Sequence, residues 1–191
     1  MNKIISQFCK STGVCGSMLG RIMTVSNRKM HRAVLKELGG SECILEIGFG
    51  TGSQLEMISR SYPGAELFGI DISEDMLKAA RKRLNRKAKL SLCDCAKTDF
   101  QDGSFDAVIT TDTCYFWQDS QRVLTEIKRI TKPGGRLILA YNSMYAGSVR
   151  KSAGTAMYSD ETITSEITRA GMTLLKKRCC GFAHLFHPGQ D

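Results

Sequence analysis

The chain has 191 residues and a formal net charge of +8. This length suits one domain with a sizeable core. The sequence holds no run of about 18 apolar residues, which excludes a predicted transmembrane helix, and its first residues lack the hydrophobic stretch of a signal peptide. We therefore expect a cytoplasmic protein.

The eight cysteines show no paired C-x-x-C arrangement. This spacing favours reduced thiols over a disulfide framework or a metal site. The adjacent residues Cys179 and Cys180 form the one pair whose redox chemistry would be worth testing.

Residues 1–40 precede the first predicted strand and contain two helical patterns. Apolar side chains recur at helical spacing in both: Met18, Leu19, Ile22 and Met23, then Met30, Val34, Leu35 and Leu38. The pair Gly39-Gly40 ends the second pattern. The segment is basic and too short to bury its own core. We expect it to cover the cleft of a main domain spanning residues 41–191, with simple packing on that domain as the alternative.

An apolar strand over residues 43–47 leads into a glycine-rich loop. Its glycines stand at alternate positions: Gly48, Gly50 and Gly52. Glycine lets the backbone turn sharply and approach a ligand closely, and free N–H groups at the start of the following helix, about Ser53 to Ser61, face that ligand. Glu46 interrupts the apolar strand and requires a partner. A dinucleotide-binding loop would need glycine at position 53, where this chain has serine.

Asp71 stands nineteen residues after Gly52 and closes a second apolar strand over residues 66–70. An acidic side chain at this position can accept hydrogen bonds from both hydroxyls of a ribose. Ser73 then caps a predicted helix. The glycine loop and Asp71 together predict a site for a ligand that carries a ribose.

Residues 78–89 are strongly basic and contain no acidic residue. The basic positions are Lys78, Arg81, Lys82, Arg83, Arg86, Lys87 and Lys89. This run indicates either the solvated face of a surface helix or a patch for nucleic acid or an anionic membrane. Apolar residues at helical spacing supply the buried stripe that the first interpretation requires: Met76, Leu77, Ala80 and Leu84.

Two further strands end in candidate site residues. The third, about Lys89 to Cys93, leads into Asp94 and Cys95. The fourth, over residues 103–109, leads into a polar and then aromatic stretch: Thr110, Thr111, Asp112, Thr113, Cys114, Tyr115, Phe116 and Trp117. In open α/β sheets, ligands bind outside the carboxyl ends of the strands. These residues are therefore expected beside the ligand, with core packing as the alternative for the aromatic side chains.

The rest of the chain continues the alternation of helices and strands. A helix begins at Asp119 or Ser120 and ends before Lys132-Pro133-Gly134-Gly135, and a fifth strand follows over residues 136–140. Residues 141–158 read as a loop, and a helix runs from Ser159 to Gly171. The last part predicts a hairpin of residues 172–178 and 182–187.

These motifs, in this order, resemble the class I, seven-stranded S-adenosylmethionine (SAM) methyltransferases over residues 42–171. The matching features are the spacing of Glu46 with the three glycines, then Asp71, Asp94-Cys95, Ser104-Phe105-Asp106 and Lys132-Pro133-Gly134-Gly135. The stretch from Tyr115 to Asp119 is most similar to the small-molecule branch. The resemblance implies an α/β, doubly wound, mostly parallel seven-stranded sheet of order 3-2-1-4-5-7-6, with helices on both faces and an N-terminal helical extension.

The resemblance also implies SAM as the cofactor, S-adenosylhomocysteine (SAH) as the product, and no metal. Cofactor contacts are expected from Glu46, Gly48, Gly50, Gly52, Asp71, Ile72, Asp94, Cys95 and Thr111. Asp94 would accept a hydrogen bond from the adenine amino group. Acceptor contacts are expected from Tyr115, Trp117, Tyr141 and Tyr145. Where the acceptor needs a base, the candidates are Tyr115, Asp112 and His31, with Tyr141 as a fourth.

A small-molecule methyltransferase is the function that we expect. Nucleic-acid amino methyltransferases carry Asn/Asp-Pro-Pro-Tyr after the fourth strand, where this chain has Thr111-Asp112-Thr113-Cys114, so we expect no nucleic-acid partner. The alternatives are a phospholipid or RNA methyltransferase that uses the basic segments, with peripheral membrane contact, and a SAM-binding protein without catalysis. The sequence leaves the oligomeric state open.

Overall fold

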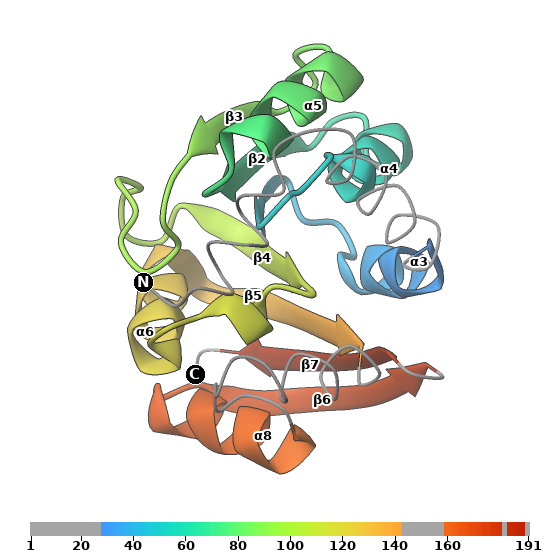
Figure 1. The fold of residues 1–191 in the computed structure, drawn as a ribbon. Helices are drawn as coiled ribbons and strands as arrows, with labels where there is room; N and C mark the ends of the chain where they lie inside the picture. Colours follow the sequence, from blue (N-terminus) through green and yellow to red (C-terminus); the bar gives the residue numbers. More distant parts are fainter. Residues whose placement is uncertain (1–27, 143–158, 181–182, 190–191) are drawn as a thin grey trace.

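The computed structural model describes residues 28–142, 159–180 and 183–189. The strands are β1 (Cys43–Ile47), β2 (Glu66–Asp71), β3 (Lys89–Leu92), β4 (Phe105–Thr111), β5 (Thr131–Asn142), β6 (Thr173–Cys180) and β7 (Ala183–Gly189). They form one sheet in the order β3-β2-β1-β4-β5-β7-β6 (Figure 1). Strands β1 to β5 pair in parallel, and β7 pairs antiparallel with β5 and β6. This topology confirms the predicted fold.

Helices cover both faces of the sheet. They are α3 (Arg28–Glu37), α4 (Ser53–Ser61), α5 (Glu74–Leu84), α6 (Ser120–Ile130) and α8 (Asp160–Arg169), with a 3-10 turn η1 (Cys114–Phe116). Helices α3, α4 and α5 pack on one face, and α6 and α8 pack on the other (Figure 1). Along β1, Ile44 faces the first layer of helices, while Leu45 and Ile47 face the second. Because side chains alternate along a strand, Glu46 shares the face of Ile44.

Strand β5 is longer than predicted and includes the Lys-Pro-Gly-Gly segment. Thr131 pairs with Phe105 and Arg136 pairs with Ala107, so residues 132–135 bulge out between two paired positions. The bulge turns at Gly134, where φ is +73°. The proline ends helix α6 as predicted, but the chain enters the sheet at once, without a separate turn before the strand.

Helix α3 belongs to the same core as the sheet. Its apolar stripe is buried as predicted, with Met30, Val34 and the following Leu38 in the layer beneath α4. Its end is also tied down, because Glu37 pairs with Lys176 at 2.9 Å. The first predicted helix of the segment 1–40 lies outside the described residues. Within the described ranges, no helix has the length and apolar character needed to span a bilayer.

Candidate cofactor site

The glycine-rich loop joins β1 to α4 and leaves an open space at its middle position. All three glycines have positive φ, with +72° at Gly48, +53° at Gly50 and +75° at Gly52. A Cβ on Gly48 would lie 2.2 Å from Thr113 Cγ2, so this glycine is required for packing against the end of β4. A Cβ on Gly50 would meet no atom within 4 Å. The loop therefore leaves room for a ligand to approach its backbone at Gly50.

Asp71 holds the loop from the end of β2. Its Oδ2 accepts a hydrogen bond from the Gly50 N–H at 2.9 Å, and its Oδ1 accepts one from the Ser73 N–H at 2.9 Å. Burial raises the pKa of this carboxyl, and these backbone hydrogen bonds partly oppose that effect. A carboxylate can accept about four hydrogen bonds, so Asp71, which the Ile72 N–H also contacts, retains capacity to accept from a ligand hydroxyl. The neighbouring Ile72 side chain is 53% exposed.

Three side chains near this loop carry buried polar atoms that have no hydrogen-bond partner within the part of the chain that the structure describes. Glu46 is 3% exposed and its Oε2 accepts no hydrogen bond; neither amide atom of Gln54, 2% exposed, has a partner; and Thr111 Oγ1 is also unpaired. They come from β1, α4 and β4, and Glu46 and Thr111 both face α3 and α4. Burial, then the charge of Asp71, raises the pKa of Glu46 well above its usual value. Because unsatisfied buried polar atoms are costly, this cluster indicates a polar ligand.

Sequence reasoning missed Gln54. It lies in the first turn of α4, on the buried side that also carries Leu55 and Ile58. A glutamine within an otherwise apolar helix stripe, immediately after a glycine loop, is the signal that would have found it.

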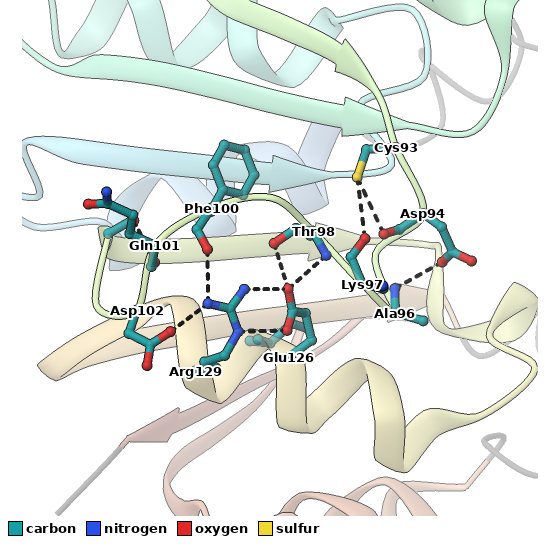
Figure 2. Close-up of polar contacts among 12 residues, drawn as sticks. Cys93, Asp94, Ala96, Lys97, Thr98, Phe100, Gln101, Asp102, Glu126 and Arg129 are labelled. Atoms are coloured by element: carbon teal, nitrogen blue, oxygen red, sulfur yellow. Dashed lines mark hydrogen bonds and ion pairs between the residues drawn. The ribbon is translucent and has the colours of Figure 1, made fainter.

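Asp94 follows the edge strand β3 and keeps one carboxylate oxygen available. Its Oδ1 accepts a hydrogen bond from the Ala96 N–H at 2.9 Å, and its carbonyl oxygen accepts one from the Lys97 N–H at 3.2 Å. These bonds fold the loop back on itself beside the end of β3 (Figure 2). Burial raises the pKa of the adjacent Cys95 thiol to about 12, so this thiol stays protonated at neutral pH.

Comparison with known proteins identifies the family. The family model described as a methyltransferase domain matches residues 45–139. The chain is also 31% identical over 147 residues to the uncharacterized methyltransferase YdaC of Bacillus subtilis, which covers 74% of this chain and 81% of the relative. The chain belongs to the class I SAM-dependent methyltransferases. SAM is therefore the expected cofactor.

Other relatives of this methyltransferase are longer or more distant. It is 33% identical over 125 residues to a ubiquinone/menaquinone biosynthesis C-methyltransferase of Desulfotalea psychrophila, and the match covers 63% of this chain and 51% of the relative. The chain thus spans about half the length of that protein. A putative methyltransferase of Haloferax volcanii, solved in complex with a methyltransferase activator, superposes with a TM-score of 0.83 at 18% identity, over 97% of this chain and 96% of that one. This likeness supports the fold.

The predicted cofactor residues of the methyltransferase fall at one edge of the sheet. Glu46, Asp71 and Thr111 stand at or near the carboxyl ends of β1, β2 and β4, and Asp94 follows β3. The open space at Gly50, the remaining lone pairs of Asp71 and the unpaired polar cluster suit a ligand with hydroxyl, amino and carboxylate groups. The described residues therefore fit SAM.

The candidate bases of the methyltransferase lie in two places. His31 is buried in α3, and burial lowers its pKa to about 4, so its imidazole is neutral at neutral pH. Asp112 follows β4 with φ of +55°, in the left-handed region that few residues other than glycine adopt. Its Oδ1 lies 3.1 Å from the Tyr115 hydroxyl and accepts a hydrogen bond from the Asn142 N–H at 2.8 Å. Burial and the Asp112 charge raise the pKa of Tyr115, which therefore stays protonated.

The predicted acceptor aromatics lie in the core layer beneath α6 and α8. Tyr115, Trp117 and Tyr141 are all buried there. The Tyr141 hydroxyl donates to Asp160, and Trp117 Nε1 has no partner within the described ranges. Packing accounts for most of this burial, so the acceptor role of these side chains stays a prediction. Tyr145 lies outside the described residues.

A hollow of about 300 Å³ lies on the other side of the sheet, near the amino ends of β1, β4 and β5. It is lined by residues 39–42, 106 and 132–136. Both carboxylate oxygens of Asp106 have partners there. It accepts hydrogen bonds from the Cys43 N–H at 2.8 Å and the Glu42 N–H at 3.2 Å, and it pairs with Lys132 Nζ at 2.8 Å. The hydrogen bond from Lys132 is the main cause that lowers the pKa of Asp106.

Proposed function

We propose that this protein transfers the methyl group of SAM to a small-molecule acceptor. The observation that carries the proposal is the set of unpaired polar atoms beside the glycine loop and Asp71. Asp71 would accept hydrogen bonds from the ribose hydroxyls, and Asp94 Oδ2 would accept one from the adenine amino group. Glu46, Gln54 and Thr111 would pair with the amino and carboxylate groups at the other end of the cofactor.

The residues of the chain would act mainly by positioning. SAM supplies a methyl group that its sulfonium already activates, so alignment of the acceptor and exclusion of water are the principal tasks left to the protein. Tyr115 would help to position Asp112, because its hydroxyl donates to Asp112 Oδ1 at 3.1 Å or to the Asn142 carbonyl at 2.8 Å. Asp112 and the neutral His31 are the groups able to take a proton from an acceptor hydroxyl or amine.

Two observations support a small acceptor. The Desulfotalea relative is named as a quinone-biosynthesis C-methyltransferase, and planar aromatic acceptors of that kind match the aromatic side chains predicted after β4. At the end of β4 the chain has Thr111-Asp112-Thr113-Cys114. Nucleic-acid amino methyltransferases have Asn/Asp-Pro-Pro-Tyr there, with which they hold a base.

Calorimetry with SAH, followed by methyl-transfer assays, tests the proposal. SAH should bind, and NAD should bind far more weakly, because Ser53 replaces the dinucleotide glycine. Radiolabelled SAM should label hydroxylated quinones or phenols in preference to bulk RNA or phospholipid vesicles. Absence of SAH binding would refute the cofactor assignment, and efficient labelling of bulk RNA would refute the acceptor class.

The basic face of α5 supports a second candidate, a methyltransferase that acts at an anionic surface. Lys78, Arg83 and Lys89 pair with glutamates. Across the described ranges, four exposed cations nearby form no ion pair: Arg81, Lys82, Arg86 and Lys87. Co-sedimentation with anionic vesicles at rising salt tests this candidate, because binding through exposed charges should weaken steeply as salt screens them. Equal sedimentation with neutral vesicles would argue against it.

We also propose that residues 1–40 cover the cofactor cleft. Met30 and Val34 of α3 and the following Leu38 belong to the core, so the informative truncation begins at Arg28 and keeps this helix. That variant should fold but lose most turnover and part of its SAH affinity. Full turnover in the truncated protein would contradict the cover. A chain that begins at Ser41 should instead lose stability, because the side chains beneath α3 become exposed.

A further inference from the structure

Helix α6 grips the loop that follows β3, residues 93–104, through one carboxylate. Glu126 Oε1 accepts hydrogen bonds from both the Thr98 N–H at 2.7 Å and the Thr98 hydroxyl at 2.6 Å (Figure 2). Arg129, one turn further along α6, donates from Nη2 to Oε1 at 2.7 Å and from Nε to Oε2 at 2.8 Å. Four donors thus converge on a single side chain of the helix, and they lower its pKa to about 2.

Arg129 extends the grip to the far end of the loop. Its Nη1 donates to the Phe100 carbonyl at 2.9 Å and to Asp102 Oδ1 at 2.5 Å, and its own carbonyl accepts a hydrogen bond from the Gly103 N–H at 2.9 Å. The Phe100 ring meets Phe105 edge to face, with the ring centroids 4.8 Å apart. Both halves of a loop without helix or strand are therefore fixed by the same two residues.

Asp94 is joined to this grip by a single turn of backbone. The hydrogen bond from the Lys97 N–H to the Asp94 carbonyl closes the turn, and Thr98 follows immediately. The Ala96 N–H fixes Asp94 Oδ1 and leaves Oδ2 for a ligand. Because Asp94 is exposed, no surrounding core holds its side chain in place. The direction of its side chain therefore depends on the position of the turn, and the hydrogen bonds from Thr98 to Glu126 fix that position.

We propose that Glu126 and Arg129 are positioning residues for purine selectivity: they hold the turn so that Asp94 meets an exocyclic amino group. This inference rests on the proposed function, in which the ligand carries adenine. A displaced Asp94 would lose its hydrogen bond to the amino group while the ribose contacts at Asp71 remain. Loosening the grip should therefore reduce discrimination between purines more than it reduces total affinity.

The test compares SAH with S-inosylhomocysteine, whose hypoxanthine has a carbonyl oxygen in place of the amino group. The parent protein should prefer SAH by at least about tenfold, the scale of one charged hydrogen bond, and Asp94→Ala should bring that ratio close to one. Glu126→Gln keeps the shape of the side chain but loses the charge that binds Arg129. It should lower the ratio by at least about threefold. Arg129→Lys keeps the charge without the planar fork and should have an intermediate effect.

Glu166→Gln is the matched control. Glu166 of α8 accepts hydrogen bonds from Ser120 at 2.6 Å and Gln121 at 2.7 Å at the opposite end of α6, and these bonds also lower its pKa. Its replacement should reduce thermal stability about as much as Glu126→Gln does and leave the ratio unchanged. An unchanged SAH preference in Glu126→Gln, or an equal fall of that preference in Glu166→Gln, would overturn this inference and leave the proposed function standing. A parent protein that binds neither ligand would overturn the proposed function and this inference with it.

Discussion

The parallel strands begin at one side of the sheet, called here the amino edge, and end at the other, the carboxyl edge. The carboxylates at these two edges have opposite environments. At the amino edge, both oxygens of Asp106 have partners, two backbone N–H groups and Lys132, and its pKa is lowered. At the carboxyl edge, Glu46 is buried with an unpaired oxygen, and the pKa values of Glu46 and Asp71 are raised. The amino edge also has a hollow, but its charged groups satisfy one another. Hydrogen-bonding capacity left unmet inside the fold, more than empty volume, therefore distinguishes the candidate cofactor site from the hollow.

Asp71→Ala should have the largest effect on binding. Two charge-assisted hydrogen bonds of about 1.5–3 kcal/mol each would be lost, so SAH affinity measured by calorimetry should fall at least tenfold. Asp106→Ala is the counterpart at the amino edge. It should lower the free energy of unfolding by about 1–3 kcal/mol and leave SAH affinity within about twofold. Equal losses of affinity in the two variants would break the contrast between the edges.

Gly50→Ala should have the next largest effect. The new Cβ would stand in the open space of the loop, where the ligand is expected, so SAH should bind about tenfold more weakly. The positive φ should also lower the free energy of unfolding by about 1 kcal/mol. Gly134→Ala is the control, because Gly134 also has positive φ and open space but lies in the bulge at the amino edge. It should cost similar stability, measured by chemical denaturation, with SAH affinity unaffected. A Gly50→Ala protein with parental affinity would show that no ligand lies over the loop.

The pH dependence of stability should differ in sign between the edges, and this is the smallest effect. Burial raises the pKa of Glu46 in the folded state, so its contribution to stability is complete below the unfolded pKa and is lost as pH rises through the folded value. The pKa of Asp106 is lowered, so its contribution is complete above the unfolded pKa and is lost as pH falls through the folded value. The melting temperature of Glu46→Gln should therefore fall less than that of the parent as pH rises. The melting temperature of Asp106→Asn should fall less than that of the parent as pH is lowered. The opposite assignment would contradict the described environments.

The sequence predicted most of the strands and which residues lie at the carboxyl edge, while the strand order came from the resemblance to the SAM methyltransferases. The glycine spacing, the apolar strands and the acidic residues at their ends are local patterns, and parallel strands bring their ends together without further information. The limits of α4 were predicted to the residue, because a glycine loop precedes the helix and a Tyr-Pro-Gly turn follows it.

Other features depended on tertiary pairing that local patterns do not encode. Strand β5 starts early because Thr131 pairs with Phe105 of β4, ahead of the bulge. Gln54 interrupts the apolar stripe of α4, but the sequence does not show that its amide is buried without a partner, and that burial is what marks it as a candidate site residue. The aromatic residues after β4 have the spacing of a pocket and of a core alike, and the structure places them beneath α6 and α8.

The insertion of β7 between β5 and β6 has a consequence for synthesis on the ribosome. Strand β6 touches the rest of the sheet only through β7, which is translated after it. The five parallel strands can therefore assemble first, but β6 lacks its native neighbour until β7 is complete, and the backbone groups that β7 would meet stay unpaired. Loss of β7, for example by truncation ahead of Ala183, would leave the facing edges of both β5 and β6 open to pairing with another chain.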